Sequence, residues 1–365
     1  MSIFTNNIPL LVTFFFAGMF VFSVLINTIL LRFSKTLGIR NNPDQQIRWS
    51  STVKPAVGGI SFFIVFLLSF LALGLVIKNF SDYLNSPKLV GLLVAVTIAF
   101  IMGLADDAFD TNPLIKLSAQ IGCALTIMLT GTKICCFESE FVNYLITFLW
   151  VVGLMNSINM LDNMDGITTL VSIMILLFFV SQRLIIKDQL IPQSFICLAM
   201  LGALSGFIIF NWHPSKMFMG DTGSQVLGIL LAFMGIDFCW NTPVETNNTI
   251  ITFLPLKNFL IATTIFVLPI ADTFTVFTNR LLKGNSPFVG GKDHTTHHLF
   301  FRGISEKRIA VIFTFIGALG VYFGYELTGI NSKNNSDYYV FLLFPFIIIS
   351  ALYLNTKIKN GKNKT

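Results

Sequence analysis

The stretch IPLLVTFFFAGMFVFSVLINTILL, residues 8–31, runs for 24 residues without a charged side chain. A helix needs about 20 mostly apolar residues to cross the hydrocarbon of a bilayer. Backbone polar groups in lipid must be paired within the segment, so this run predicts a transmembrane helix. The residues before it contain no Lys or Arg, which favours a retained helix over a cleaved signal peptide.

Apolar runs of similar character recur along the whole chain. The sequence is 54% hydrophobic and only 12% charged, with a mean hydropathy of +0.76, whereas soluble domains carry about 25% charged residues. We therefore predict an all-α, polytopic membrane bundle of about eleven transmembrane helices, forming one domain over 1–365 with a basic tail at 357–365. The other ten predicted segments are 57–77, 89–105, 114–131, 141–161, 167–182, 191–210, 223–240, 258–279, 309–328 and 338–356.

The basic residues are distributed unevenly between the connections. Seventeen of the 24 Lys and Arg residues follow odd-numbered predicted helices or lie in the tail. Cytoplasmic loops carry an excess of Lys and Arg, so we predict the N-terminus outside and the C-terminus in the cytoplasm. The net charge of +6 is then explained by this bias, and no nucleic-acid partner is expected.

Five polar clusters also follow odd-numbered predicted helices, which places them on the same membrane face as the basic loops. An adjacent pair of carboxylates and a basic, histidine-containing stretch are among them. We expect these clusters to form one site. They are Lys54–Gly59, Asp106–Lys116, Asn156–Gly166, Asn211–Ser224 and Gly290–Arg302.

Asp106 and Asp107 end the third predicted helix. Two adjacent carboxylates at a membrane boundary repel each other, and a cation would relieve this cost. Oxygen ligands suit Mg²⁺ or Mn²⁺, with phosphates completing the coordination, and Lys116 could contact a phosphate. A solvated acidic helix end is the alternative.

In NSINMLDNMDG, residues 156–166, polar residues recur every third position: Asn156, Asn159, Asp162 and Asp165. A step of three drifts about 60° short of a helical turn, so we expect the helix to unwind near Asp162. Polar groups at this depth need a protein interior or a water-filled cavity. A polar contact between helices is the alternative.

The stretch NWHPSKMFMGDTGS, residues 211–224, joins the seventh and eighth predicted helices. Its glycines allow close backbone approach, and the following helix would present its positive N-terminus to an anion. Asp221 there suggests a metal that bridges carboxylate and phosphate, although a plain N-cap by Asp221 or Thr222 is the alternative. Asn211 is a further candidate contact.

His294, His297 and His298 lie among basic residues that include Arg302. We favour anion binding over a zinc site, because the surrounding positive charge would oppose a dication. Asp272 and Arg280, two turns apart, suggest either an ion pair or a catalytic role.

The double glycine Gly58-Gly59 follows Lys54 at the start of the second predicted helix. We count all three as candidate substrate-binding residues. A turn or a packing contact at the glycines is the alternative.

The motifs GLADDAFD with KLSAQ, NSINMLDNMDGITTL, GFIIFNWHPSKMFMGDTGSQVLG and HTTHH, in this order, resemble those of a known family. The chain resembles the bacterial polyprenyl-phosphate N-acetylhexosamine-1-phosphate transferases of glycosyltransferase family 4, from about residue 43 to 303. The group includes undecaprenyl-phosphate GlcNAc-1-phosphate transferases. HTTHH is one residue longer than the family's H-x-H-H motif.

The resemblance implies an enzyme of the bacterial inner membrane with a cytoplasmic active site. Such enzymes transfer a sugar 1-phosphate from a UDP-N-acetylhexosamine, most simply UDP-GlcNAc, to undecaprenyl phosphate, and they use Mg²⁺ and release UMP. The product would initiate a lipid-linked cell-envelope glycan. A homodimer is left open.

The resemblance also implies roles for the motif residues. Asp221 would be the chief metal ligand, with Asp106 and Asp107 beside it, and Asp107 could deprotonate the acceptor. The implied substrate contacts are Lys116, Asn156, Asn159, Asp162, Asp165, Asn211, His294, His297 and His298.

A secondary transporter is the competing interpretation. Many helices and intramembrane carboxylates are typical of both classes. A transporter would place its polar residues near the midplane with access to both faces, whereas here the clusters gather on one face.

Overall fold

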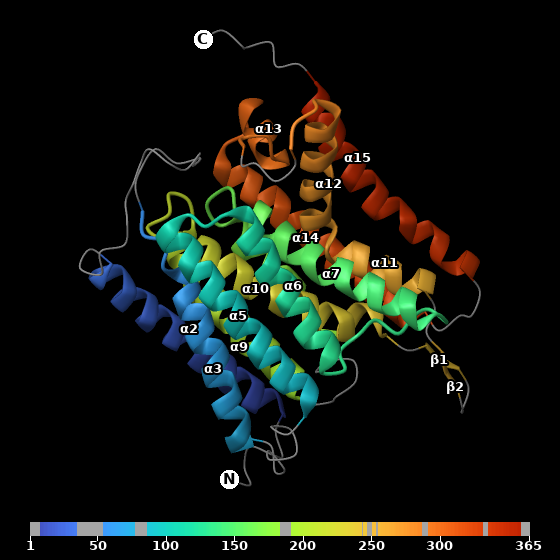
Figure 1. Ribbon diagram of the computed structural model, residues 1–365, viewed down its shortest axis with the longest axis horizontal. Coiled ribbons are helices and arrows are strands. Elements are labelled where there is room, and N and C mark those ends of the chain that lie inside the picture. Colours follow the sequence, from blue (N-terminus) through green and yellow to red (C-terminus); the bar gives the residue numbers. More distant parts are fainter. Residues whose placement is uncertain are drawn as a thin grey trace.

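A computed structural model describes residues 8–34, 54–76, 86–182, 191–242, 244–246, 250–252, 255–286, 291–330 and 335–358. The predicted all-helical bundle is confirmed (Figure 1). Each of the eleven predicted apolar segments coincides with a helix or with two consecutive helical elements. Within the described residues the structure adds the short helix α13 (Thr295–Phe301) and a short antiparallel hairpin, β1 (Val244–Thr246) with β2 (Ile250–Thr252). Residues 359–365 of the predicted basic tail lie outside the described part.

The first half of the bundle consists of six described helices. They are α2 (Ile8–Phe33), α3 (Gly58–Val76), α5 (Pro87–Phe109), α6 (Pro113–Leu129), α7 (Glu140–Leu161) and α8 (Ile167–Ser181). Pro87 and Pro113 occupy first-turn positions, where the missing N–H costs nothing.

The second half contains the most buried helices and one sharp bend. It comprises α9 (Pro192–Asn211), α10 (Gly220–Gly235) with η2 (Ile236–Trp240), α11 (Pro255–Ile265), α12 (Val267–Leu282), α13 (Thr295–Phe301), α14 (Glu306–Gly329), and η3 (Asn335–Leu342) with α15 (Leu343–Lys357). Helices α11 and α12 bend by 83° at Phe266.

The count of eleven membrane crossings is not confirmed. Within the described residues, seven helices are long and apolar enough to span a membrane, or eight if the bent pair α11–α12 is one span. Three further apolar helices are shorter, at Gly58–Leu73, Pro113–Leu129 and Ile167–Ser181. A helix of 17 residues is roughly 26 Å long, less than the roughly 30 Å of hydrocarbon. The protein is multi-pass, and its orientation remains a prediction.

Helix α10 is the central element of the bundle. In the most apolar 18 residues of Gly220–Trp240, 94% of the residues are buried, compared with 11% in the N-terminal helix and 17% in the C-terminal helix. Helix α10 packs against α3, α5 and α7. Glycines permit this approach: a Cβ on Gly59 would lie 2.1 Å from the Gly223 nitrogen, and one on Gly103 would lie 2.5 Å from the Thr222 Cα. The start of α10 is therefore fixed between α3 and α5.

Candidate active site

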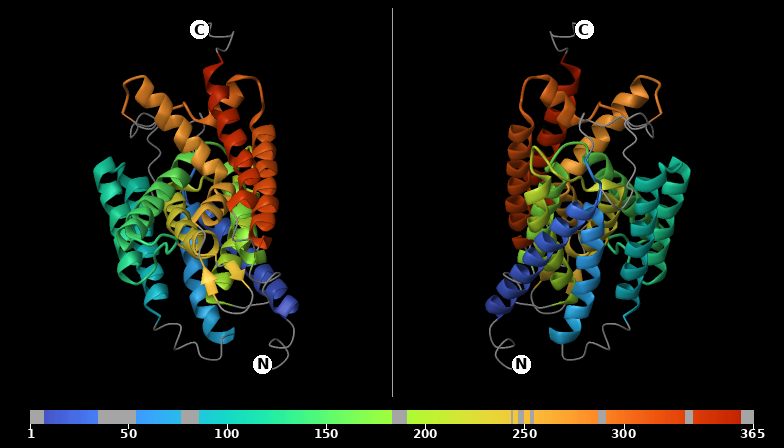
Figure 2. Two further views of the ribbon diagram at one scale, coloured as in Figure 1. Left: turned by 90° about the vertical axis from the view of Figure 1, so that its right-hand side faces the viewer. Right: turned by 90° about the vertical axis from the view of Figure 1, so that its left-hand side faces the viewer.

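The predicted polar clusters meet at one end of the bundle, the end at which α13 lies and α15 finishes (Figures 1 and 2). Helix α2 starts at the opposite end. Hydrogen bonds and ion pairs join residues of all five clusters there, as described below. The prediction that the motifs share one side of the protein is thus confirmed, while the membrane face that this side occupies is a separate matter.

Asp106, Lys116 and Asp221 form the centre of this site. The Lys116 Nζ atom lies 2.9 Å from Asp106 Oδ2 and 2.6 Å from Asp221 Oδ1. Helix α5 ends after Phe109, and Asn112 caps α6 by accepting a hydrogen bond from Leu114 N. This tight turn brings Lys116, on the first turns of α6, back over Asp106.

Each carboxylate of this centre has a second partner that holds it in place. Asp106 Oδ1 accepts hydrogen bonds from the backbone N–H and the hydroxyl of Thr111. Asp221 Oδ1 also accepts a hydrogen bond from Asn159 Nδ2, which contacts Ser224 Oγ at 2.8 Å. Asn159 therefore has a defined position beside Asp221, as the sequence predicts for a residue of the site.

Asp107 faces a different direction and caps α10. Its Oδ1 accepts a hydrogen bond from Asp221 N at 2.9 Å, and its Oδ2 accepts bonds from Thr222 N at 2.9 Å and Thr222 Oγ1 at 2.6 Å. A carboxylate at a helix N-terminus is favourable because it satisfies free N–H groups and complements the helix dipole. Both oxygens of Asp107 therefore accept hydrogen bonds from the start of α10, whereas the sequence predicted that Asp107 binds a metal ion.

This cap also changes the expectation for the start of α10. The sequence suggested that the helix N-terminus faces a phosphate. Instead, the N–H groups of Asp221 and Thr222 donate to Asp107. The positive end of α10 is therefore neutralised within the protein, and the caps predicted from Asp221 or Thr222 are replaced by one from α5.

Asn156 belongs to a buried amide cluster rather than to the carboxylate centre. Its Nδ2 donates to Gln120 Oε1 at 2.7 Å, and Gln120 Nε2 donates to Asn156 Oδ1 and to Gln225 Oε1, both at 3.2 Å. These amides link α6, α7 and α10. The open alternative, a polar contact between helices, describes Asn156 as it lies here.

The expected break after Asn159 is present. Helix α7 ends at Leu161, and Gly166 has a φ of 77°, a left-handed conformation that favours glycine. Asp162 lies in this linker. Burial, followed by the negative charges of Asp221, Asp107 and Asp165, raises the pKa of Asp162 to about 8.

Asp165 binds the α9–α10 loop. Its Oδ2 accepts a hydrogen bond from Ser215 N at 2.9 Å, and its Oδ1 accepts one from Ser215 Oγ at 2.7 Å. Lys54 Nζ lies 3.0 Å from Ser215 Oγ, 3.5 Å from Asp165 Oδ2 and 5.1 Å from the centre of the Phe218 ring. Lys54, Asp165 and Ser215 therefore form a second polar group at this end.

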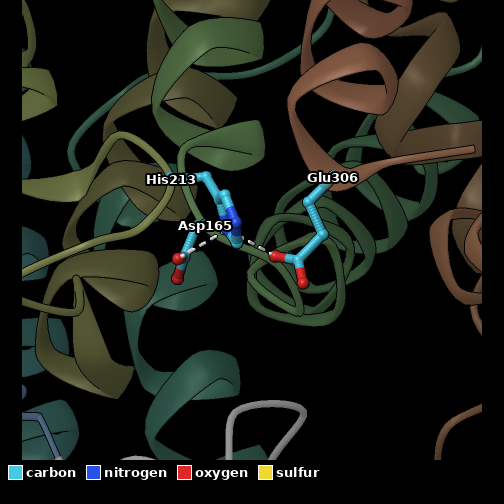
Figure 3. Close-up of side chains that lie close together, drawn as sticks. All are labelled: Asp165, His213 and Glu306. Atoms are coloured by element: carbon cyan, nitrogen blue, oxygen red, sulfur yellow. Dashed lines mark ion pairs between the residues drawn. The ribbon is translucent and has the colours of Figure 1, made fainter.

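His213 extends that group to α14, a connection that the sequence analysis missed (Figure 3). Its Nδ1 lies 3.2 Å from Asp165 Oδ2 and 2.9 Å from Glu306 Oε2. The three ligand-type atoms lie within 4.8 Å of one another. Asp165 Oδ2 also contacts Ser215 N and Lys54, so this carboxylate has hydrogen-bond and ion-pair partners within the protein. The arrangement joins the α7–α8 linker and the α9–α10 loop to the start of α14.

Asn211, Gly58 and Gly59 hold the loops of the site together. Asn211 Oδ1 accepts hydrogen bonds from Gly166 N and Thr169 Oγ1, and its Nδ2 donates to Met217 O. Gly58 N and Gly59 N donate to the carbonyls of Phe218 and Met219. The packing alternative fits the glycines, and Asn211 has partners on both ends of its amide.

The histidine segment forms the short helix α13, with His294 as its N-cap residue. His294 Nδ1 lies 2.8 Å from Asp272 Oδ2, whose other oxygen accepts bonds from Thr295 N and Thr295 Oγ1. Thr296 Oγ1 donates to Asn163 Oδ1, so α13 adjoins the linker that carries Asp162 and Asp165.

The other predicted anion-binding residues of this segment lie in different surroundings. Burial, and then the charge of His294, lowers the pKa of His297 to about 4; burial, and then Lys283, lowers that of His298. Arg302 is exposed and donates to the Asn355 carbonyl of α15. Its contact is thus to the C-terminal helix.

The suggested pairing of Asp272 with Arg280 is wrong. Arg280 Nε and a terminal guanidinium nitrogen bind the two oxygens of Asp293, at 2.8 Å and 2.7 Å. Asp272 binds His294 and Thr295 instead. Two helical turns separate Asp272 from Arg280, and each reaches a nearer partner in the segment that leads into α13.

A divalent cation fits the chemistry of the central carboxylates. Asp106 and Asp221 place hard oxygen atoms on either side of the Lys116 ammonium, so this position already accommodates a positive charge. Mg²⁺ is bound by one or two carboxylates together with waters and substrate phosphates. The donor set is therefore suitable, and Asp107 is not needed to complete it.

The fold and this carboxylate-rich end define a multi-pass membrane protein with a polar site to which all five clusters contribute. Residues 89–239 match the model of glycosyl transferase family 4, and this stretch contains Asp106, Asp107, Lys116, Asp162 and Asp221. Over this stretch the chain is similar to that family.

Three relatives illustrate the similarity. The probable undecaprenyl-phosphate N-acetylglucosaminyl 1-phosphate transferase of Bacillus subtilis is 25% identical over 339 residues, covering 90% of this chain and 87% of that protein. The phospho-N-acetylmuramoyl-pentapeptide-transferase of Prochlorococcus marinus (strain MED4) is 28% identical, covering 85% and 89%. The decaprenyl-phosphate N-acetylglucosaminephosphotransferase of Mycobacterium leprae is 25% identical, covering 72% and 70%.

Proposed function

We propose that the protein transfers N-acetylhexosamine 1-phosphate, most simply GlcNAc 1-phosphate, from a UDP-sugar to undecaprenyl phosphate and releases UMP. The reaction initiates a lipid-linked glycan of the cell envelope. It takes place in the bacterial cytoplasmic membrane, with the active site on the cytoplasmic face. The family and the names of relatives in Bacillus subtilis and Mycobacterium leprae support the acceptor and the sugar phosphate.

The observation that carries this proposal is the position of Lys116 between Asp106 and Asp221. These groups lie at one end of a membrane bundle, where a lipid-anchored phosphate and a soluble nucleotide sugar can meet. Phosphoryl transfer depends on positioning and on neutralising charge, and it needs little covalent chemistry from the protein. A cluster of carboxylates and one lysine meets that need when a divalent cation is bound.

Asp221 and Asp106 would hold Mg²⁺, which would neutralise the diphosphate of the donor. Asn159 and Thr111 orient these carboxylates through the hydrogen bonds described above. Asp107 acts by capping α10, which fixes the start of the helix that carries Asp221. Lys116 is free to move from the carboxylates to a phosphate oxygen once the cation has arrived.

The acceptor needs no strong base, because a phosphate monoester is already largely dianionic near pH 7. Its oxygen attacks the β-phosphorus of the UDP-sugar, the bond from that phosphorus to the bridging oxygen breaks, and UMP leaves with the electron pair. Asp165 belongs to the stretch for which the resemblance implies substrate contacts, and Lys54 and Ser215 contact its carboxylate.

The test uses purified protein in detergent with undecaprenyl phosphate and a panel of UDP-sugars, and measures UMP. Release of UMP with UDP-GlcNAc in Mg²⁺, its loss in EDTA, and loss of nearly all turnover in folded Asp221→Asn are expected. No UMP from any UDP-sugar with the polyprenyl phosphate would contradict the function. Full activity in EDTA would contradict the metal requirement alone.

A further inference from the structure

Asp272 carries a buried carboxylate that the proposed reaction has not yet used. It lies in α12 and has no exposed surface. Burying a carboxylate is costly unless it is paired and hydrogen-bonded, so such a residue has either a structural or a functional reason. Both oxygens have partners, and all of these belong to the first residues of the histidine segment.

The two oxygens of Asp272 do different things. Oδ1 accepts hydrogen bonds from Thr295 N at 2.8 Å and Thr295 Oγ1 at 2.7 Å, which fixes the start of α13. Oδ2 contacts His294 Nδ1 at 2.8 Å. The first role is structural, while the second determines the state of an imidazole ring.

A carboxylate oxygen can only accept a hydrogen bond from a ring nitrogen, so Nδ1 of His294 carries the proton in this contact. The ring is then fixed in orientation, and Nε2 is the nitrogen left for a ligand. Nε2 donates a hydrogen bond when the ring is charged and accepts one when it is neutral. The same carboxylate–histidine arrangement orients imidazole rings in many catalytic and metal sites.

The surroundings set His294 apart from the other two histidines. His297 meets the His294 ring edge-on with centroids 5.3 Å apart, and its lowered pKa of about 4 keeps it neutral at pH 7. Asp293 also bears on His294, but Arg280 engages both of its oxygens. Asp272 is therefore the carboxylate that touches the His294 ring.

Helix α13 is also close to the proposed reaction. Thr296 binds Asn163, the residue after Asp162, and the charge of Asp221 acts on Asp162. The histidine segment thus adjoins the linker that faces the metal-binding carboxylates.

We propose that Asp272 is a positioning residue: it holds His294 by Nδ1 so that Nε2 binds a phosphoryl oxygen of the donor. This inference rests on the proposed transferase function and adds a positioning carboxylate to a histidine contact that the resemblance already implies. The binding partner is defined by its chemistry, as the oxygen of a phosphate diester or diphosphate.

Substitutions at His294 separate its two nitrogens. In His294→Asn the side-chain amide nitrogen can replace Nδ1 as the donor to Asp272, while nothing replaces Nε2. We expect this variant to unfold at the wild-type temperature, but with kcat lowered about 10- to 100-fold, the effect of losing one hydrogen bond to a charged group. His294→Asn with wild-type kcat would overturn the proposal, because the residue would then serve only as a tie.

Asp272→Asn tests the positioning role, with Thr295→Val as its matched control. Thr295→Val removes a hydroxyl bond to Oδ1 and leaves the His294 contact, so kcat should stay within about threefold. Asp272→Asn should lower kcat about tenfold or more, and adding it to His294→Asn should cause no further loss. A further tenfold loss in the double variant would show that Asp272 acts elsewhere and would overturn the inference.

A spectroscopic measurement separates this inference from the function itself. In ¹⁵N-histidine-labelled protein, the signal of a protonated Nδ1 assigned to His294 should be present in the wild type and in Thr295→Val, and altered in Asp272→Asn. An unchanged signal in Asp272→Asn would overturn the proposed contact. If the wild type releases no UMP from any UDP-sugar, the function fails while this measurement still decides whether Asp272 fixes the ring.

Discussion

Replacing Lys116 by Met should destabilise the protein and make its stability depend on Mg²⁺. The ammonium lies 2.9 Å from Asp106 Oδ2 and 2.6 Å from Asp221 Oδ1, and the three side chains are 18%, 9% and 25% exposed. Removing one partner of a buried ion pair costs about 3–5 kcal/mol, because it leaves an uncompensated charge. Partial exposure puts the expected loss in the free energy of unfolding near the lower limit, about 3 kcal/mol.

The assay is unfolding in detergent with and without Mg²⁺. A ligand that binds only the folded state, at 100 times its dissociation constant, stabilises by about 2.7 kcal/mol. Mg²⁺ should therefore recover most of the loss in Lys116→Met. In the wild type the gain should be smaller, because binding must first displace the ammonium. Turnover should stay low in the variant even with Mg²⁺, since the phosphate contact is lost.

Lys133→Met is the matched control. Lys133 pairs with Glu140, whose side chain is 66% exposed, in the connection that leads into α7. Exposed pairs contribute little, so this variant should unfold like the wild type and respond to Mg²⁺ in the same way. Wild-type stability of Lys116→Met in EDTA, or an equal effect of Mg²⁺ on both variants, would refute the assignment of this centre as a cation site.

Three further outcomes follow from the site. Asp107→Asn and Thr222→Val should both lower stability, since each weakens the cap of α10. The Mg²⁺ affinity, measured by titration, should change less in these variants than in Asp221→Asn. An equal loss of affinity in Asp107→Asn would identify Asp107 as a ligand. The raised pKa of Asp162 means that the folded state holds its proton longer than the unfolded state, so stability falls as pH rises from about 4 to 8. Asp162→Asn should leave unfolding unchanged below pH 4 and raise the unfolding temperature increasingly towards pH 8, and a constant difference would contradict this. The pKa of His297 is lowered, so between pH 6.5 and 4 the unfolded state binds more protons than the folded state, and stability should fall as the pH falls through this range. His297→Gln should flatten that fall when unfolding is followed against pH.

The helical fold and the common end of the motifs could be predicted because they depend on local composition. Each apolar run is long enough to demand internal backbone pairing, and each polar cluster follows such a run. The number of crossings could not be predicted in this way. The run at 258–279 is mostly apolar, with Asp272 as its one charged residue, yet the chain bends by 83° at Phe266 within it.

The roles of the acidic residues depend on the direction in which each side chain points, and the sequence pattern does not give this direction. Successive residues on an α-helix point about 100° apart, so Asp106 and Asp107 reach different partners although they are adjacent. Asp106 faces Lys116, whereas Asp107 faces the start of α10. Adjacent acidic residues in a helix therefore do not indicate a shared partner.

The contacts between distant segments could not be predicted from the sequence, for a different reason. His213 is a single histidine in a loop, and its partner Glu306 lies far along the chain at the start of α14. His213 lies within the motif at 211–224 without a spacing that marks it, and Glu306 lies outside all of the motifs. Only the fold shows that the α7–α8 linker, the α9–α10 loop and α14 meet at this point.

The central lysine explains how the carboxylates of Asp106 and Asp221 can lie close together without a bound cation. Asp106 and Asp221 together carry a formal charge of −2, and partial burial makes their repulsion costly. Lys116 reduces the charge to −1 and holds the carboxylates in place through short contacts. Mg²⁺ would change the same centre to +1, which suits an incoming diphosphate. The ammonium, displaced from the carboxylates by the cation, could then bind a phosphate oxygen of the donor. Lys116 would thus stabilise the carboxylates before the cation binds and contribute to substrate binding afterwards.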